Sequence, residues 1–415
     1  MIWFILKWVL SILIWPFAII ARPFVKKPQT YPPITVETFS IYSYDTIDEK
    51  HVLEEESSHN FQTGLYYPVT IGEILGAQYQ FSTGQPVSLK GYISSPGGDL
   101  EFRIYELIRR VHSHSWHEGG NHIRKVLDLF LVQGANVDYW CLVQRPLLQN
   151  LNQLQGSFHS GRVPSQLAKS ILKQVLLGLD FIHRKCGIVH TDIKNENIME
   201  GLSDMSLYQQ FVLTELAQPS PRKFVNGHPI YMSRFFLGTN LFEKAVLSDF
   251  RNAMRGDHTH NVYGGTDYYR APEVMFQADW TYLIDIWSFG ITAWILVQGD
   301  FLFDHTLRKD YVGDECQCQH HYDADRQVAE MVRLLGPPPA DLLKPGSKAL
   351  DYFDPSGKLK PDKSNFEKRT FESAETIMEE GEKALFLDFI GGMIQWRPKD
   401  RKTAAELLKD PWLNS

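Results

Sequence analysis

The segment from Ile188 to Met199 constrains the chain more than any other. It reads Ile-Val-His-Thr-Asp-Ile-Lys-Asn-Glu-Asn-Ile-Met, apolar at its ends and polar between them, and it directly follows a helical pattern. This pattern predicts a polar loop held between apolar elements. A loop rich in Asp, Lys and Asn is usually an ordinary turn, so the landmarks that come later in the chain decide whether it carries chemistry.

The loop resembles the catalytic loop of protein kinases. The residues at that family's spacing are His190, Asp192, Lys194 and Asn197, and Thr191 stands where arginine is commonest. Phosphoryl transfer needs a carboxylate that orients the attacking hydroxyl, a cation on the moving phosphoryl group and an oxygen ligand for magnesium. The resemblance implies that Asp192, Lys194 and Asn197 have these roles in turn. Asp192 and Lys194 are thus the candidate catalytic residues, and Asn197 is a candidate metal ligand.

Three more landmarks of protein kinases follow in the expected order. An apolar segment ends in Ser-Asp-Phe250, which would present Asp249 to a magnesium ion that bridges the ATP phosphates. Gly265-Thr-Asp-Tyr-Tyr-Arg-Ala-Pro-Glu273 resembles the end of an activation segment, and Asp285-Ile-Trp-Ser-Phe-Gly290 lies in a helical pattern. Together the landmarks predict a bilobal protein kinase fold of the α+β class, with ATP and Mg2+ as cofactors and Asp249 as the second metal ligand.

The hydrophobic periodicity predicts a small β-rich N-lobe followed by a large helical C-lobe. Strands are predicted at 87–93, 126–133 and 139–143, with one helix at 101–111 between them. Helices are predicted at 167–183, 280–296, 326–335, 384–393 and 404–409. We expect a kinase domain over residues 66–413, with the small lobe at 66–148, the large lobe at 149–413 and an insert at 200–245.

The nucleotide contacts are expected in the small lobe and at its junction with the large lobe. Val87-Ser-Leu-Lys90 resembles the Val-Ala-Ile-Lys strand of protein kinases, which implies that Lys90 contacts the α- and β-phosphates. Glu101, in the predicted helix, is its candidate partner. Gln144 and Arg145 stand where the family has an aromatic and then an acidic residue at the hinge, which binds adenine mainly through its backbone. The candidate cofactor-binding residues are Lys90, Glu101, Gln144 and Leu147.

Two departures from the family pattern bear on activity. No Gly-x-Gly-x-x-Gly or similar loop lies between Gln78 and Val87, so fewer backbone N–H groups would cover the phosphates. Arg251 replaces the glycine of Asp-Phe-Gly, which removes conformational freedom beside the metal ligand. Two hypotheses stay open: an active kinase, or a pseudokinase that acts as a membrane-tethered regulatory or scaffold protein. A gene model that lacks an exon would also explain the missing loop.

The chain is similar to the serine/arginine-rich protein kinases, particularly their fungal relatives, over about residues 52–413. The shared features are Tyr67-Pro-Val-Thr-Ile-Gly72, His190-Thr-Asp192, the insert segment from Pro219 to Arg234, and Leu334-Leu-Gly-Pro-Pro-Pro339. Lys194 and Thr266 further resemble the serine/threonine branch of the kinases. The resemblance implies ATP-dependent phosphorylation of serine in Arg/Ser-rich or otherwise basic protein segments, such as those of splicing factors.

A structural ion pair is also expected in the large lobe. Glu273 ends the Ala-Pro-Glu motif, and Arg401 ends the late segment Trp396-Arg-Pro-Lys-Asp-Arg401. A buried carboxylate and guanidinium at these two positions would hold the activation segment against the helical lobe.

The N-terminus predicts a membrane anchor. Residues 2–21 are nearly all apolar and are about as long as a membrane-spanning helix. Arg22, Lys26 and Lys27 follow this segment against the single Lys7 within it, so the positive-inside rule places the body of the chain in the cytoplasm. We expect an anchor at 1–22 and a linker at 23–65. An interfacial helix or an organelle-targeting segment stays open, as does a location in the cytoplasm and nucleus.

The charge balance argues against one class of partner. The chain has 42 Lys and Arg against 49 Asp and Glu, so no positive field over the whole chain favours direct nucleic-acid binding. The expected partners are a protein substrate, ATP and the membrane.

Overall fold

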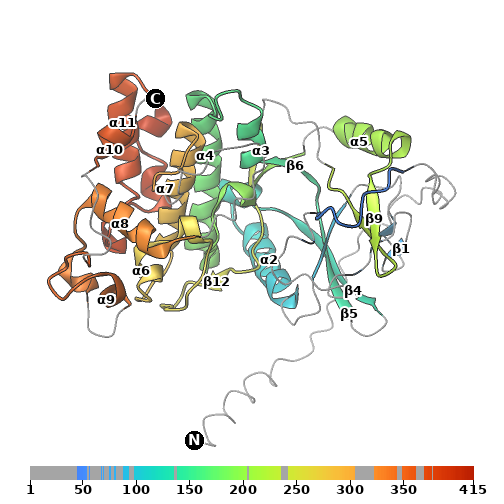
Figure 1. Ribbon diagram of the computed structural model, residues 1–415, viewed down its shortest axis with the longest axis horizontal. Coiled ribbons are helices and arrows are strands. Elements are labelled where there is room, and N and C mark those ends of the chain that lie inside the picture. The colour runs from blue at the N-terminus through green and yellow to red at the C-terminus, as the bar shows by residue number, and fades with distance from the viewer. Residues whose placement is uncertain are drawn as a thin grey trace, which may run out of the picture.

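The computed structural model of the protein describes residues 44–53, 56, 67, 69, 74–75, 79–80, 87–92, 98–134, 138–202, 205–234, 242–303, 322–343, 348–360, 369–375 and 377–415. These residues form a part that carries most of the strands and a larger helical part, which lie side by side (Figure 1). Helix α2 (Gly98–Ser113) lies where the two parts meet. The predicted bilobal α+β architecture is confirmed.

The small lobe is built on a three-stranded antiparallel sheet in the order β3-β5-β4. Its strands are β3 (Ser88–Gly91), β4 (Val126–Gln133) and β5 (Asp138–Gln144), close to the three predicted positions. Helix α2 packs against β4 and β5. Its buried residues Glu101, Tyr105 and Ile108 recur every three or four positions, which places them on one face of the helix. Glu101 therefore points into the molecule. A separate pair of short strands joins β1 (Ile74–Leu75) to β2 (Tyr79–Gln80).

The large lobe is organised around helix α7 (Leu283–Gln298). Every residue of α7 after Leu283 is buried, as expected for a helix that is apolar on nearly all sides. The other helices of the lobe are α3 (Leu151–Gly156), α4 (Ser165–Phe181), α6 (Pro272–Met275), α8 (Ala324–Leu335), α9 (Ala349–Tyr352), α10 (Phe371–Ala374), α11 (Glu380–Gly391) and α12 (Ala404–Leu407). The five helices predicted for this lobe correspond to α4, α7, α8, α11 and α12.

Two small sheets position the polar loop singled out above. Strand β7 (Ile188–Val189) pairs with β12 (Met254–Arg255). Strand β8 (Ile198–Gly201) lies between β6 (Leu147–Asn150) and β11 (Ala245–Leu247). Since Leu247 at the end of β11 faces Ile198 at the start of β8, the chain leaves β11 at the edge where it enters β8. Asn197 and Asp249, each within two residues of that edge, are thereby brought near each other.

The described residues of the predicted insert include a helix and a hairpin. Helix α5 (Met205–Ala217) and strands β9 (Arg222–Val225) and β10 (His228–Tyr231) lie beside the small lobe, at the end of the molecule away from α11 (Figure 1). The hairpin turns at Asn226 and Gly227, which both have positive φ (52° and 82°). Asn-Gly is the preferred sequence for a two-residue hairpin turn of this kind.

Residues 44–53, part of the segment expected to be a linker, run along this hairpin. Thr46 forms a parallel bridge with Arg222. The ammonium group of Lys223 donates hydrogen bonds to the carbonyls of Glu49 (3.0 Å) and His51 (2.6 Å), and it lies 2.6 Å from the carboxylate of Glu56. Lys223 is only 1% exposed. These contacts fix the segment that leads into the small lobe onto the insert.

The predicted membrane anchor at residues 1–22 lies outside the described residues. In the part of the chain that the structure describes, no helix has both the length and the apolar character needed to cross a membrane. The anchor stays a prediction.

Candidate active site

Asp285 fixes the backbone of the loop that carries Asp192. Its carboxylate, in the first turn of α7, is fully buried. It accepts hydrogen bonds from the N–H groups of His190 (2.7 Å) and Thr191 (2.8 Å), and His183 Nε2 lies 2.9 Å from Oδ2. Thr191 has a φ of 70°, a left-handed conformation that is unfavourable for a β-branched residue. The bonds to Asp285 stabilise this conformation and so set where the next residue, Asp192, points.

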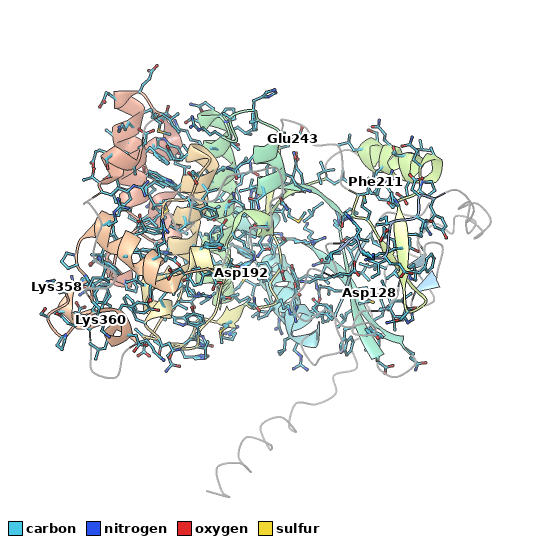
Figure 2. The ribbon with its side chains drawn as sticks, in the orientation of Figure 1. Asp128, Asp192, Phe211, Glu243, Lys358 and Lys360 are labelled. Atoms are coloured by element: carbon cyan, nitrogen blue, oxygen red, sulfur yellow. The ribbon has the colours of Figure 1, made fainter. Side chains whose placement is uncertain are left out.

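Asp192 belongs to a closed network of side chains. Thr266 Oγ1 donates to Asp192 Oδ1 over 2.6 Å, and Lys194 Nζ donates to Thr266 Oγ1 over 2.8 Å. Asp192 Oδ2 lies 3.3 Å from Lys194 Nζ and accepts a bond from Asn197 Nδ2 over 3.1 Å. Asp192 lies between the helical lobe and the strands that carry Asp128 (Figure 2). The structure therefore brings together three residues predicted from the loop sequence and Thr266, which the resemblance to serine/threonine kinases also singles out as their partner.

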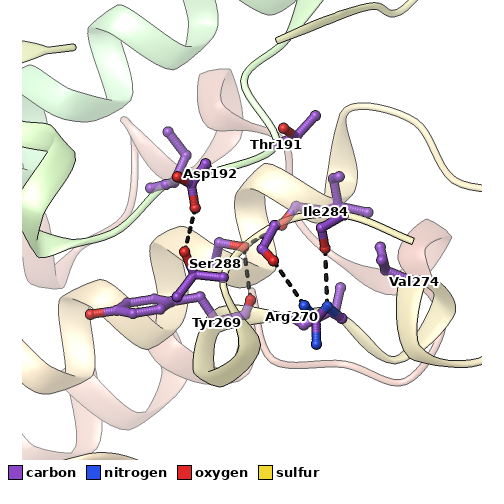
Figure 3. A pocket seen from close by; sticks show the side chains of 12 residues that line it. Thr191, Asp192, Tyr269, Arg270, Val274, Ile284 and Ser288 are labelled. Atoms are coloured by element: carbon purple, nitrogen blue, oxygen red, sulfur yellow. Dashed lines mark hydrogen bonds between the residues drawn. The ribbon is translucent and has the colours of Figure 1, made fainter. Parts of the chain in front are cut away.

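A small pocket lies between this loop and the activation segment. Asp192 lies on one side of the pocket and Arg270 on the other (Figure 3). Arg270 is buried, and its Nε and Nη2 donate to the carbonyls of Gly264 (3.0 Å) and Gly265 (2.8 Å). Because Gly265 directly precedes Thr266, these bonds hold the segment that delivers the Thr266 hydroxyl to Asp192.

Asp249 follows β11 in a conformation set by its neighbour Phe250. Phe250 is fully buried, with its ring centroid 5.1 Å from that of Tyr105 and 4.6 Å from that of His190. Asp249 has a positive φ of 62°. With Phe250 packed between α2 and the polar loop, the carboxylate of Asp249 is directed to the junction of the two lobes, where it meets Lys90.

Lys90 connects two carboxylates. Its Nζ lies 2.9 Å from Glu101 Oε2 and 2.7 Å from Asp249 Oδ1, so the predicted contact between Lys90 and Glu101 is confirmed. The hydroxyl of Tyr92 also donates to Glu101. Burial raises the pKa of Asp249, but the charge of Lys90 and its hydrogen bond more than compensate, so that the pKa lies below its usual range. Asp249 is therefore ionised at neutral pH and available to a cation.

The donor groups of Asn197 and Asp249 fit a magnesium ion. Ser248, the residue before Asp249, binds the carbonyl oxygen of Asn197 through its N–H (2.9 Å) and its Oγ (3.0 Å), which fixes the two segments to each other. Carboxylate and amide oxygens are hard ligands of the kind that Mg2+ takes, together with phosphate oxygens and water. Among the described residues, no group of three or more His, Cys, Asp or Glu side chains is placed to hold a metal ion. Asn197 and Asp249 would therefore hold a magnesium ion only together with other ligands, such as the phosphate oxygens of a nucleotide.

At the hinge, between β5 and β6, the polar residues Gln144 and Arg145 stand where the family has an aromatic and then an acidic residue. Gln144, the last residue of β5, is 1% exposed, and its Oε1 has no hydrogen-bond partner in the described structure. Leu147 begins β6 on the other side of the hinge. Arg124, which no motif or spacing in the sequence singles out, places its Nη2 3.1 Å from Ser88 Oγ and 3.4 Å from the carbonyl oxygen of Arg145. These residues come from three separate segments of the chain, around positions 88, 124 and 144–147, so only the folded sheet brings them together.

The predicted ion pair between Glu273 and Arg401 is confirmed. The guanidinium and carboxylate meet through two parallel contacts of 2.7 Å, and both side chains are fully buried. Arg401 Nε also donates to the carbonyl of Gln395. The pair joins α6, at the end of the activation segment, to the C-terminal part of the large lobe.

Comparisons with known proteins agree with this geometry. The family model described as "Protein kinase domain" matches residues 125–233 and 238–413. The chain belongs to the protein kinase family. A serine/threonine protein kinase of Aspergillus fumigatus is 32% identical over 96% of this chain and 99% of its own length. The serine/threonine-protein kinase SRPK of Physarum polycephalum is 28% identical over 87% of this chain and 91% of its own length. The predicted resemblance to this group of kinases is thus confirmed.

A solved structure extends the comparison to three dimensions. A crystal structure of a kinase domain matches with a TM-score of 0.61 at 19% identity, over 84% of this chain and 99% of that chain. At this identity the likeness shows the shared protein kinase fold. In such kinases, the lysine–glutamate pair and the magnesium-binding aspartate must both be in place for transfer. In this protein kinase, Lys90 contacts both carboxylates at once.

Proposed function

We propose that this protein kinase is active and transfers the γ-phosphoryl group of ATP to hydroxyl groups of serine or threonine in protein substrates. The observation that carries the proposal is the network around Asp192. Its carboxylate is fixed by Thr266 and Asn197, and it lies 3.3 Å from the ammonium group of Lys194. A carboxylate in this setting orients the attacking hydroxyl and accepts its proton, while the neighbouring ammonium stabilises charge on the moving phosphoryl group. Mg2+ at Asn197 and Asp249 would neutralise phosphate charge.

The replacement of glycine by Arg251 is compatible with activity. The φ of Arg251 is not positive, so its position makes no use of the conformational freedom that is special to glycine. Its side chain is exposed, and its N–H donates to Asp249 Oδ1 over 3.4 Å. Arg251 thus leaves the Asp249 carboxylate and its contact with Lys90 in place, which favours the active-kinase hypothesis over the pseudokinase one.

For the substrate, we propose serine in Arg/Ser-rich or otherwise basic segments of proteins such as splicing factors. Glu196, in the same loop as Asp192, is exposed and accepts one hydrogen bond from Asn152, and Asp267, which directly follows Thr266, is half-exposed and paired with Arg270. Exposed carboxylates near the catalytic residue suit arginine-containing substrates, because guanidinium groups form strong, often bidentate pairs with carboxylates. Similarity to the relative named SRPK supports the same substrate class.

We also propose that residues 1–22 anchor the kinase to a membrane, with the body in the cytoplasm. The apolar length of this segment and the three cations that follow it support the proposal. Fractionation of cells that express the chain with and without residues 1–27 tests it. We expect the full chain in the membrane pellet and the shortened chain in the soluble fraction. Recovery of both in the soluble fraction would instead favour the cytoplasm and nucleus.

The activity itself is tested by transfer of labelled phosphate from Mg-ATP to an arginine-serine peptide, with Asp249→Ala as control. We expect transfer by the wild type that is lost in the variant. A matched peptide with lysine in place of arginine separates a general preference for basic substrates from recognition of the guanidinium group. Absence of both transfer and nucleotide binding in the wild type would select the pseudokinase hypothesis, in which the chain acts as a membrane-tethered regulatory or scaffold protein.

A further inference from the structure

Tyr92 is a buried tyrosine beside the Lys90–Glu101 pair, and none of the sequence landmarks of the site includes it. It directly follows β3, and its N–H donates to the carbonyl of Trp140 over 2.9 Å, so the strand pairing extends to Tyr92. Because side chains alternate along a strand, Tyr92 and Lys90, two positions apart, point to the same face of the sheet. Tyr92 is 4% exposed, and Lys90 Nζ lies 5.4 Å from the centroid of its ring. Tyr92 therefore lies on the face that meets Glu101 of α2.

The carboxylate of Glu101 accepts hydrogen bonds from three residues. Lys90 Nζ donates to Oε1 over 3.2 Å and to Oε2 over 2.9 Å. The N–H of Phe250 donates to Oε1 over 3.2 Å, and the hydroxyl of Tyr92 donates to Oε2. Glu101 is fully buried, and a carboxylate removed from water needs such donors to remain charged. Each of its oxygens is thus held by Lys90 and by one further donor.

Tyr92 differs from Lys90 in that its bond to Glu101 does not depend on other groups. Lys90 divides its ammonium group between Glu101 and Asp249, and it is proposed to contact the phosphates as well. The hydroxyl of Tyr92 has one hydrogen to donate, and Glu101 receives it. Burial and the charge of Glu101 raise the pKa of Tyr92 above its usual range, so the hydroxyl keeps its proton at neutral pH. Tyr92 therefore holds the Glu101 carboxylate whichever other group Lys90 meets.

We propose that Tyr92 is a positioning residue for phosphoryl transfer, whose hydroxyl holds Glu101 so that Glu101 in turn holds Lys90 at the phosphates. The inference rests on the proposed function, because it concerns how the same site is kept aligned. Phe250, which bonds the same carboxylate through its N–H, directly follows Asp249 in the chain. Since kinases need both the lysine–glutamate pair and this aspartate in place, the hydroxyl of Tyr92 acts on both through Glu101.

The first test is Tyr92→Phe, which removes the hydroxyl and keeps the ring. We expect kcat for phosphate transfer from Mg-ATP to the arginine-serine peptide to fall by about tenfold, the effect of losing one hydrogen bond to a charged group. The KM for the peptide should stay unchanged, because the network around Asp192 that meets the substrate hydroxyl is built from residues of the large lobe. A fall in kcat/KM that came from KM alone would refute the positioning role.

Tyr139→Phe is the matched control. Tyr139 lies on β5 and is 5% exposed, so its burial is similar to that of Tyr92. Lys90 faces Leu142 across the β3–β5 ladder, and Tyr139, three positions from Leu142, points to the opposite face of the sheet. Its hydroxyl is therefore on the side away from Glu101, and its loss should leave kcat and KM unchanged. Equal falls of kcat in the two variants would show a general effect of removing a buried hydroxyl from this sheet.

A double-mutant cycle tests whether Tyr92 acts through the charge of Glu101. In a Glu101→Gln background, Tyr92→Phe removes a bond to a neutral amide, so it should lower kcat by less than it does in the wild type. Equal falls in both backgrounds would show that the hydroxyl acts elsewhere. Melting temperatures of all variants monitor the fold. Failure of Tyr92→Phe to fold would assign the hydroxyl a role in folding and would also refute the positioning role.

The outcomes separate this inference from the proposed function. If the wild type and Tyr92→Phe transfer phosphate with the same kcat, the positioning role is wrong while the kinase function stands. If the wild type transfers no phosphate and Mg-ATP does not shift its melting temperature, the proposed function fails and the inference falls with it. Transfer by the wild type, a reduced kcat in Tyr92→Phe and normal transfer by Tyr139→Phe would support both.

Discussion

The two sides of the active site differ in how fully their polar groups are paired. On the large-lobe side, Asp192, Lys194 and Thr266 form a closed set of hydrogen bonds. On the small-lobe side, Oε1 of Gln144 and Nε of Arg124 are buried without hydrogen-bond partners in the described structure. The residues proposed to act in phosphoryl transfer are thus paired with one another, while Gln144 and Arg124 keep buried polar atoms without partners among the described residues. The polar residues of the catalytic loop thus follow the family pattern, whereas Gln144 and Arg145 depart from it at the hinge.

The largest effect is expected from the large-lobe side. Asp192→Asn keeps the shape of the side chain but removes its ability to accept the substrate proton, so the transfer rate should fall by about 10²–10⁴-fold. The measurement is kcat for phosphate transfer to an arginine-serine peptide. Asp388→Asn, at a carboxylate that is 74% exposed, is the matched control and should transfer normally. Equal activity of the two variants would show that Asp192 is not the group that acts on the hydroxyl.

A second large effect concerns stability. Arg401→Met leaves the carboxylate of Glu273 buried without its partner, which should lower the free energy of unfolding by about 3–5 kcal/mol. Chemical denaturation of the full chain measures this change. Arg397→Met, which breaks an exposed pair with Asp341, is the control, and its effect should be small. If the free energy of unfolding fell equally in the two variants, burial of the Glu273–Arg401 pair would not determine how much that pair contributes to stability.

A smaller effect on catalysis is expected at Thr266. Thr266→Ala removes the hydroxyl that bridges Asp192 and Lys194, so the transfer rate should fall by about tenfold, the effect of one hydrogen bond to a charged group. Thr266→Ser restores the hydroxyl and should recover most of the rate. A change in KM with an unchanged transfer rate would count against a positioning role for this hydroxyl. So would failure of Thr266→Ser to recover the rate.

The sequence predicts the large-lobe side well because its residues are close together in the chain. Asp192, Lys194 and Asn197 lie within one short loop, so their spacing alone indicates a common site. Glu101 and Lys90 are separated by a short connection, and the helical period places Glu101 on the buried face. The strands and helices were predicted for the same reason, since hydrophobic periodicity is a local signal.

The residues that the sequence does not predict depend on contacts between distant segments. Arg124 acquires its contacts only when β3 and the hinge meet around it. Lys223 similarly looks like an ordinary basic residue of a surface hairpin, yet it is buried by residues 44–53 and paired with Glu56. In both cases the one available signal is a cation next to an apolar segment, which is too common to distinguish a buried side chain from an exposed one.

The smallest predicted effect returns to the small-lobe side and has the opposite sign. Gln144→Met replaces a buried amide, with an unpaired oxygen, by an apolar side chain of similar length. Since the unpaired oxygen is destabilising in the free protein, the variant should raise the free energy of unfolding by about 1 kcal/mol and weaken binding of the purine base. Thermal unfolding with and without Mg-ATP measures both changes. Gln149→Met is a demanding control, because the amide of Gln149 is equally buried but donates to Glu200, so its loss should destabilise the protein. If Gln144→Met were destabilising as well, its amide would already be paired in the free protein, and the contrast between the two sides of the site would not hold.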